Sequence, residues 1–242
     1  MPAEFDQFAA NYSGGLENPL KRWLGGEVQH WLRPKIELLI DWLTTAAAHQ
    51  CLEMASLRLL DVGCGDGQFL KLLRQAGFTG ILNGCDVSSA MIDRAQASCS
   101  DSQIGFTTQP ADTTLPFSPA SFDVIVLSAV LHHVPVAARP ALLAACANLL
   151  SPGGMIVVFE HNPFHPFTRF IVATTEIDRD AILLSPAEAT GLLKTSGLNV
   201  DHPQYLLFFP PRWTFLKSLE RWLKNWPLGG QYAIVAHKQP RS

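Results

Sequence analysis

The chain has 242 residues, of which 48% are hydrophobic and 16% are charged, and its formal net charge is −3. This length and composition suit one α/β domain with a large core, although length alone would also permit two domains. The weak negative charge and the lack of a run of Lys and Arg disfavour a nucleic-acid substrate and favour a small molecule.

No apolar run approaches the roughly 18 residues of a membrane span. The first residues, MPAEFD, lack the basic start and apolar core of a signal peptide, which predicts a cytoplasmic protein. The five cysteines are odd in number and contain no C-x-x-C pair. They are therefore expected to be reduced thiols, and neither a disulfide framework nor a zinc site is predicted.

The first fifty residues carry aromatic side chains at helical spacing. Phe5, Phe8 and Tyr12 follow this spacing, and the segment Pro19–Leu43 continues it with tryptophans and leucines. The pattern predicts an amphipathic helical cap over residues 1–50 that covers an apolar edge of the sheet.

The stretch LLDVGCGDG is the most informative part of the chain. An apolar strand, Arg58–Val62, runs into a turn with alternating glycines, and a helical pattern follows over Gln68–Ala76. This order is typical of a nucleotide-type α/β site. A dinucleotide fingerprint needs its third glycine where Gln68 stands, so the spacing disfavours NAD and FAD. A second apolar run ends at Asp86, at the distance where a second strand presents an acid to ribose hydroxyls.

Strands and helices alternate along the rest of the chain, which predicts a parallel sheet with helices on both faces. The expected strands are Arg58–Val62, Gly80–Cys85, Ile104–Thr108, Phe122–Leu127, Met155–Phe159, a run near Gln204–Phe209, and Gln231–His237. The expected helices are Gln68–Ala76, Ala90–Ser98, Ala137–Leu150, Pro186–Ser196 and Thr214–Asn225. The sequence Ser151-Pro152-Gly153-Gly154 predicts a stop and turn between a helix and a strand.

Four segments in order, LLDVGCGDG, GCDVSSAMIDRA, PADTTLPFSPASFDVIVLSAVLHHV and LLSPGGMIVVFEHNP, resemble the class I S-adenosylmethionine-dependent methyltransferases over roughly Leu57–Asn162. The resemblance implies a Rossmann-like fold with a seven-stranded, mostly parallel sheet in a single domain over residues 1–242. Residues 57–162 would form the cofactor-binding core, and residues 163–242 a substrate-side insert and the final strands. S-adenosylmethionine would be the cofactor and a small molecule the methyl acceptor.

The resemblance also implies residues for each part of the cofactor. Asp61, Gly63, Cys64 and Gly65 would hold the methionine part, and Asp86 the ribose. Val87 and Met91 would form an apolar platform for adenine. The remaining implied cofactor contacts are Ala111 and Asp112 at the adenine amino group, and Ser128 and Ala129 at the sulfonium. Tyr12 would lie near the cofactor and the acceptor.

A base is needed if the acceptor is a hydroxyl or a protonated amine. His132 and His133 follow the fourth expected strand, so they should lie at the sheet edge where open α/β folds bind ligands. His133 is the first candidate, and Glu160 and His161, just past the fifth strand, are the next. His132 is expected to hold the loop or to contact the substrate.

Arg169, in the variable insert, would hold a substrate carboxylate or phosphate, or pair with an acid such as Asp178. A metal site built from the histidines at 132, 133, 161 and 165 is disfavoured because Pro163 interrupts any helix between the last two. No metal is therefore predicted.

Some alternatives stay open at this point. A non-catalytic protein that binds S-adenosylmethionine or S-adenosylhomocysteine would keep the same cofactor residues, and an NAD-linked oxidoreductase would share the fold class. The acceptor, the methylated atom and the oligomeric state, monomer or homodimer, are not determined by the sequence.

Overall fold

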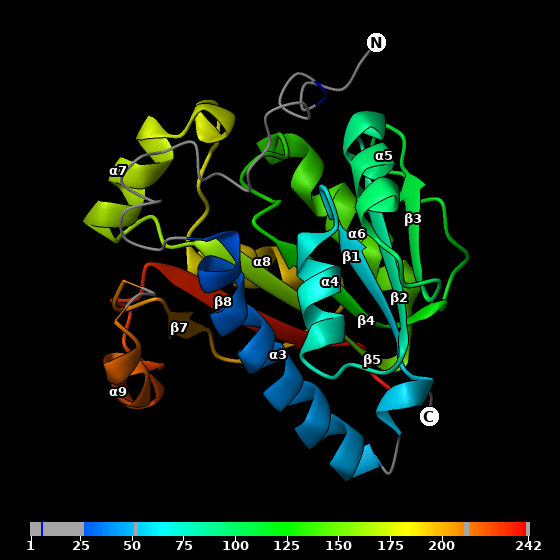
Figure 1. Ribbon diagram of the computed structural model, residues 1–242, viewed down its shortest axis with the longest axis horizontal. Coiled ribbons are helices and arrows are strands. Elements are labelled where there is room, and N and C mark those ends of the chain that lie inside the picture. Colours follow the sequence, from blue (N-terminus) through cyan, green and yellow to red (C-terminus); the bar gives the residue numbers. More distant parts are fainter. Residues whose placement is uncertain (1–5, 7–26, 51–52, 211–212, 241–242) are drawn as a thin grey trace.

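The structure is a computed structural model that describes residues 6, 27–50, 53–210 and 213–240. Within these ranges a twisted sheet lies between two layers of helices (Figure 1). The strands are β1 (Arg58–Val62), β2 (Ile81–Asp86), β3 (Ile104–Thr108), β4 (Phe122–Ser128), β5 (Leu150–His161), β6 (Asn199–Val200), β7 (Gln204–Leu206) and β8 (Gln231–His237). The α-helices are α3 (Val28–Gln50), α4 (Gln68–Gln75), α5 (Ser89–Ser98), α6 (Arg139–Leu149), α7 (Pro166–Thr174), α8 (Pro186–Thr195) and α9 (Lys217–Leu223).

The strand order is β3-β2-β1-β4-β5-β8-β6, with β7 paired to β8. The first five strands of the chain pair in parallel, whereas β8 is antiparallel to its neighbours β5, β6 and β7. The chain winds outward from β1 in one direction to β2 and β3, and in the other to β4 and β5. Ligands in such sheets bind beyond the carboxyl ends of the strands where the order reverses, here between β1 and β4.

Two apolar cores hold the helices against the sheet. In β1, Leu59 packs in one core and Leu60 in the other, because successive strand residues point to opposite faces. One core includes residues of α3 and α4, such as Leu39 and Leu73, and the other includes residues of α6 and α8, such as Leu143. Both faces of the sheet are thus covered, as expected for parallel strands.

The predicted fold class is confirmed, but the strand count is corrected from seven to eight within the described ranges. The extra strand is the two-residue β6, which is too short to give an alternating pattern in the sequence. The predicted turn at Ser151–Gly154 is also wrong, because β5 starts at Leu150 and continues through these residues. A register shift beside Phe122 and a positive φ of 79° at Gly153 let the strand absorb the extra residues.

Apart from Asp6, the predicted helical cap is described only from residue 27 onward. There α3 runs to Gln50 with Pro34 in its first two turns, and it buries Ile36, Leu39 and Leu43 against the sheet. The predicted contacts of Tyr12 lie outside the described residues. The insert after β5 contains α7 and the 3-10 turn η3 (Glu176–Asp178).

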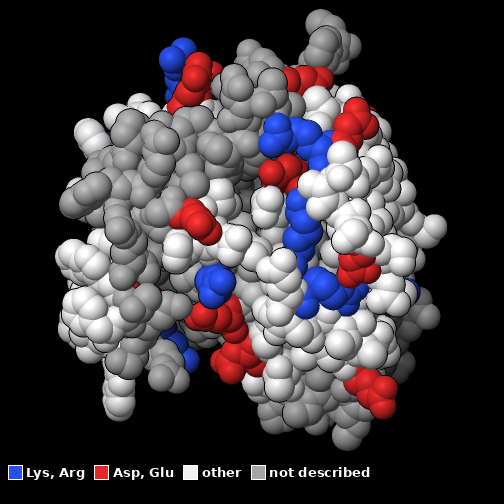
Figure 2. Space-filling model, in the orientation of Figure 1, with Lys and Arg blue, Asp and Glu red and all other residues white. Residues whose placement is uncertain are grey.

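On the face drawn in Figure 2, the Lys and Arg side chains lie beside Asp and Glu side chains. No helix in the described parts of the chain is both long enough and apolar enough to cross a membrane.

Candidate active site

One cavity of about 600 Å³ opens at the carboxyl ends of β1, β2 and β4. Its walls come from the glycine turn, the loops after β2, β3, β4 and β5, the start of α3, the insert with α7 and η3, and the segment at 207–210. In the described part of the chain, six buried side-chain polar atoms have no hydrogen-bond partner, and five belong to residues that line this cavity. They are Trp31 Nε1, Asp61 Oδ1, Gln109 Oε1, His132 Nε2 and Gln231 Oε1. Buried polar atoms are normally paired, so this concentration marks a ligand site.

The glycine turn after β1 forms the floor of the cavity. Gly63 has a φ of 75°, and a Cβ there would lie only 2.7 Å from Cγ2 of Val130. The backbone N–H groups of Gly63 and Cys64 both donate to the carbonyl of Cys85, at 2.8 and 3.0 Å, which ties the turn to β2. Gly65 also has a positive φ, of 53°. Glycine at these positions lets the backbone reach the cavity without strain.

Two buried carboxylates flank this turn. Asp61 is 2% exposed, and burial together with the nearby Asp86 raises its pKa to about 8 although Lys35 opposes the shift. Asp86 is also buried, which raises its pKa, but its oxygens accept hydrogen bonds of 2.9 Å from the N–H groups of Gly65 and Ser88. Asp86 therefore fixes the turn while it faces the cavity.

Lys35 reaches the same region from α3. Its ammonium donates to Oγ of Ser128 at 3.1 Å and lies 6.0 Å from the centre of the Phe159 ring, although the residue is only 3% exposed. Sequence reasoning missed Lys35 because it assigned this helix to apolar cover. A lysine within an apolar helical stripe was the available signal.

The wall beyond β2 and β3 holds the four residues predicted to contact adenine. Val87, Met91 and Ala111 line the cavity, as does the exposed Asp112. Asp112 accepts a hydrogen bond of 2.7 Å from the N–H of Thr114, which lowers its pKa. A residue that sequence reasoning missed, Gln109, is buried here directly after β3 with its Oε1 unpaired.

The end of β4 turns sharply at Ala129, which has a φ of 61° that is uncommon for a residue with a Cβ. Its N–H donates to the carbonyl of Phe159 at 2.8 Å, and both Ser128 and Ala129 line the cavity. The turn directs the following loop, with His132 and His133, back over the sheet edge.

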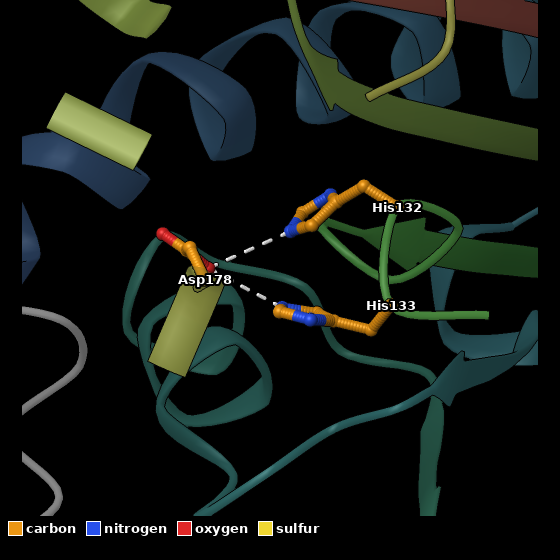
Figure 3. Close-up of side chains that lie close together, drawn as sticks. All are labelled: His132, His133 and Asp178. Carbon is orange, nitrogen blue, oxygen red and sulfur yellow. Dashed lines mark ion pairs between the residues drawn. The ribbon is translucent and has the colours of Figure 1, made fainter. Parts of the chain in front are cut away.

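The imidazole of His132 lies between the carboxylates of Glu160 and Asp178, the second of which is drawn in Figure 3. Its Nδ1 is 2.5 Å from Oε2 of Glu160, and its Nε2 is 3.7 Å from Oδ1 of Asp178. Burial lowers its pKa, but the two carboxylates outweigh burial and raise the pKa to about 9. His133 Nε2 is 3.4 Å from the same Asp178 oxygen.

Glu160 is fully buried and is not part of the cavity lining. Its Oε1 accepts hydrogen bonds from the N–H groups of Val130 and Leu131, at 3.0 and 2.7 Å. Burial raises its pKa, but His132 and these donors outweigh burial and lower the pKa to about 2. Glu160 is thus charged, and its hydrogen bonds fix the position of the loop after β4.

Comparison with known proteins agrees with this geometry. A family model described as a methyltransferase domain matches residues 60–158. The ubiquinone biosynthesis O-methyltransferase of Xanthomonas euvesicatoria pv. vesicatoria is 28% identical over 223 residues, which cover 87% of this chain and 86% of that protein. A protein of the same name from Caulobacter sp. is 35% identical over 105 residues, 42% of this chain and 40% of the other. Residues 60–158 of the chain therefore match a methyltransferase domain, and the chain as a whole is similar to methyltransferases.

Solved structures share the methyltransferase fold. A chain of the complex between the Trm112 methyltransferase activator of Haloferax volcanii and a methyltransferase superposes with a TM-score of 0.66 at 20% identity, over 99% of both chains. An S-adenosylmethionine-dependent methyltransferase from Thermotoga maritima gives 0.62 at 19% identity, over 97% of this chain and 98% of the other.

The methyltransferase cavity brings together most of the residues predicted from the sequence. They are Asp61, Gly63, Cys64, Gly65, Asp86, Val87, Met91, Ala111, Asp112, Ser128, Ala129, His132, His133 and His161. Two residues lie elsewhere. Glu160 is enclosed by its three donors, and Arg169 is exposed on α7 outside the cavity lining.

His165, considered for a metal site, instead caps α7 by accepting from the N–H of Thr168. Asp178 was missed because sequence reasoning treated it as a surface partner of arginine. No pattern in the sequence connects this residue with His132 and His133, which it meets only in the folded methyltransferase.

Proposed function

We propose that this enzyme methylates a hydroxyl group on a largely apolar small molecule. The observation that carries the proposal is that one cavity connects the glycine turn with the imidazoles of His133 and His161, and that unpaired buried polar atoms gather around it. Much of its outer wall is apolar, with Phe167, Ile171 and Ile177 from the insert. The relatives named as O-methyltransferases of ubiquinone biosynthesis support an oxygen acceptor.

The residues present suit S-adenosylmethionine. The unpaired Oδ1 of Asp61 would accept from the ammonium of the cofactor, and the carboxylate of Asp86 from the ribose hydroxyls. A Cβ on Gly63 would press on Val130, which also lines the cavity.

Val87 and Met91 would pack on adenine, with Ala111 and Asp112 at its amino group. Gln109, with its unpaired oxygen, adds a second polar contact on this wall. When bound, the cofactor supplies an electrophilic methyl group on a sulfonium.

The protein must hold the acceptor oxygen in line with that methyl group and take its proton. The S–C bond breaks, the O–C bond forms, and the proton leaves the acceptor oxygen for a neighbouring base. His133 and His161 are the imidazoles proposed for this base, because both line the cavity. Glu160 would act through His132 as a positioning residue rather than as the base, since its oxygens are engaged by the loop after β4.

Calorimetric titration and transfer assays test the proposal together. Wild-type protein should bind S-adenosylmethionine, and Asp86→Asn should weaken binding by roughly ten- to a hundredfold, because one charged acceptor for hydroxyl donors contributes about 1.5–3 kcal/mol. Asp93→Asn, an exposed change on the neighbouring helix α5, is the matched control. Labelled methyl should pass to phenolic acceptors and not to amines of the same size. Equal affinity of Asp86→Asn and wild type would refute the ribose assignment, and transfer only to amines would refute the oxygen acceptor.

A further inference from the structure

The cluster of His132, His133 and Asp178 has the composition and the spacing of a metal site (Figure 3). One ligand atom from each residue lies within 4.8 Å of the others. The two Nε2 atoms approach the same Asp178 oxygen at 3.7 and 3.4 Å, and all three residues line the cavity. Ligand atoms bound tetrahedrally at about 2.0–2.1 Å lie roughly 3.3 Å apart, so small side-chain movements would enclose an ion.

We propose that these three residues bind one divalent transition-metal ion. Two imidazoles and one carboxylate suit zinc, iron or cobalt better than calcium or magnesium, which prefer all-oxygen sites. His132 is 2% exposed, and its Nε2 has no hydrogen-bond partner although it faces the cluster. An ion bound there would take the place of the proton on this nitrogen, which faces Oδ1 of Asp178 at 3.7 Å.

The surroundings of His132 match those of metal-binding histidines. Such histidines donate their other ring N–H to a carboxylate, which fixes the tautomer and the orientation of the ring. Here Nδ1 of His132 meets Glu160 at 2.5 Å, and Glu160 is itself fixed by the N–H groups of Val130 and Leu131. The buried carboxylate therefore presents the opposite nitrogen to the cluster.

The ion would have an open side toward the cavity, since three protein ligands leave a position for water or substrate. This part of the inference rests on the proposed function. An acceptor hydroxyl that approaches the open side would lose its proton more easily, because a bound cation stabilises the oxygen anion. His133 would then be a ligand, and His161 would be the imidazole that takes the proton.

Metal titration of the full-length, tag-free protein after chelator treatment tests the site without any assay of methyl transfer. Calorimetry with Zn²⁺ and visible absorption with Co²⁺ should both show one equivalent bound, with a cobalt spectrum that lacks thiolate bands. His133→Ala and Asp178→Asn should each weaken binding by more than the roughly 10- to 100-fold that loss of an outer partner costs.

The exposed pair His237 and Asp201, whose atoms lie 3.3 Å apart, supplies the matched control. Asp201→Asn should bind metal like the wild type. Failure of the wild type to bind one equivalent, or equal binding by folded His133→Ala, would overturn the metal site. His133 is only partly buried, so its variant should fold even if Asp178→Asn does not. Because the titration needs no acceptor, a wrong acceptor class would leave the metal result unaffected, and absence of metal would leave cofactor binding intact.

Discussion

At the scale of single residues, the site contains a carboxyl group whose charged form is poorly stabilised in the ligand-free protein. Asp61 is buried beside Asp86 and has an oxygen without a hydrogen-bond partner, so its pKa is raised to about 8. A carboxylate of this kind destabilises the ligand-free fold in return for affinity toward a cationic ligand group. Stability and binding should therefore respond in opposite directions when this residue is changed.

Asp61→Asn should stabilise the ligand-free protein and weaken S-adenosylmethionine binding. With a raised pKa in the fold, the protonated acid is favoured there, so the wild type loses stability as pH rises from its unfolded value near 3.8 to about 8. The advantage of the variant should grow over that window by up to about 1.4 kcal/mol per pH unit, and stay constant above it. Denaturant unfolding at several pH values measures this. A difference that is flat with pH would contradict the burial of a raised-pKa carboxyl.

His133→Ala should leave S-adenosylmethionine affinity nearly unchanged and lower the single-turnover rate of methyl transfer by roughly 10²–10⁴-fold, the usual contribution of a proton acceptor. Loss of the metal ion in this variant would also lower the rate of methyl transfer. His237→Ala, an exposed histidine that also faces an aspartate, is the control. A loss below about tenfold would mean that alignment alone, or His161, carries the chemistry.

At the scale of elements, the strand, glycine turn and helix at 58–75 could be predicted because each piece has a local cause. The apolar run of β1, which is buried from Leu59 to Val62, the positive φ values of Gly63 and Gly65 and the helical spacing of α4 are all encoded within a few residues. The positive φ of Ala129 and the continuation of β5 through Ser151–Gly154 were not predictable, because pairing with distant strands overrides the local preference.

Alanine substitutions at two glycines with similar φ values distinguish backbone strain from a steric clash of the new Cβ. Gly63→Ala and Gly153→Ala should both lose about 1–2 kcal/mol, because alanine is disfavoured at φ values of 75° and 79°. Only at Gly63 would the new Cβ also meet Val130, whereas nothing lies within 4 Å at Gly153. Chemical denaturation should thus show the larger loss for Gly63→Ala, and calorimetry should show weakened cofactor binding in that variant alone. Equal losses and equal affinities would place the turn away from the cofactor.

At the scale of the whole molecule, the site is assembled from segments far apart in the sequence. Lys35 from α3, Asp178 from the insert and Gln231 from β8 all reach the cavity formed around the β1 turn. The periodic core pattern was enough to predict the α/β architecture and the sheet edge where the site lies. These three residues were missed because their meeting depends on how the layers pack, which no local pattern records.

Ligand binding should stabilise the whole fold, since the residues that line the cavity range from Val28 in α3 to Gln231 in β8. S-adenosylmethionine at about 100 times its Kd should add about 2.7 kcal/mol, which raises the Tm of a chain of this size by roughly 5–10 °C. Differential scanning fluorimetry with equal concentrations of S-adenosylhomocysteine and NAD provides the comparison. A shift with NAD as large as that with S-adenosylmethionine would contradict the reading of the glycine turn.

The position of β8 has a consequence for the order of events during synthesis. Among the described strands this one is made last, yet it lies between β5 and β6, and Gly230 and Gln231 at its start line the cavity. A nascent chain on the ribosome can form the parallel strands around β1 while one edge of β5 stays unpaired, and such edges are prone to aggregation. The complete cofactor cavity therefore forms only after β8 has left the exit tunnel, later than the parallel strands around β1 that make the glycine turn.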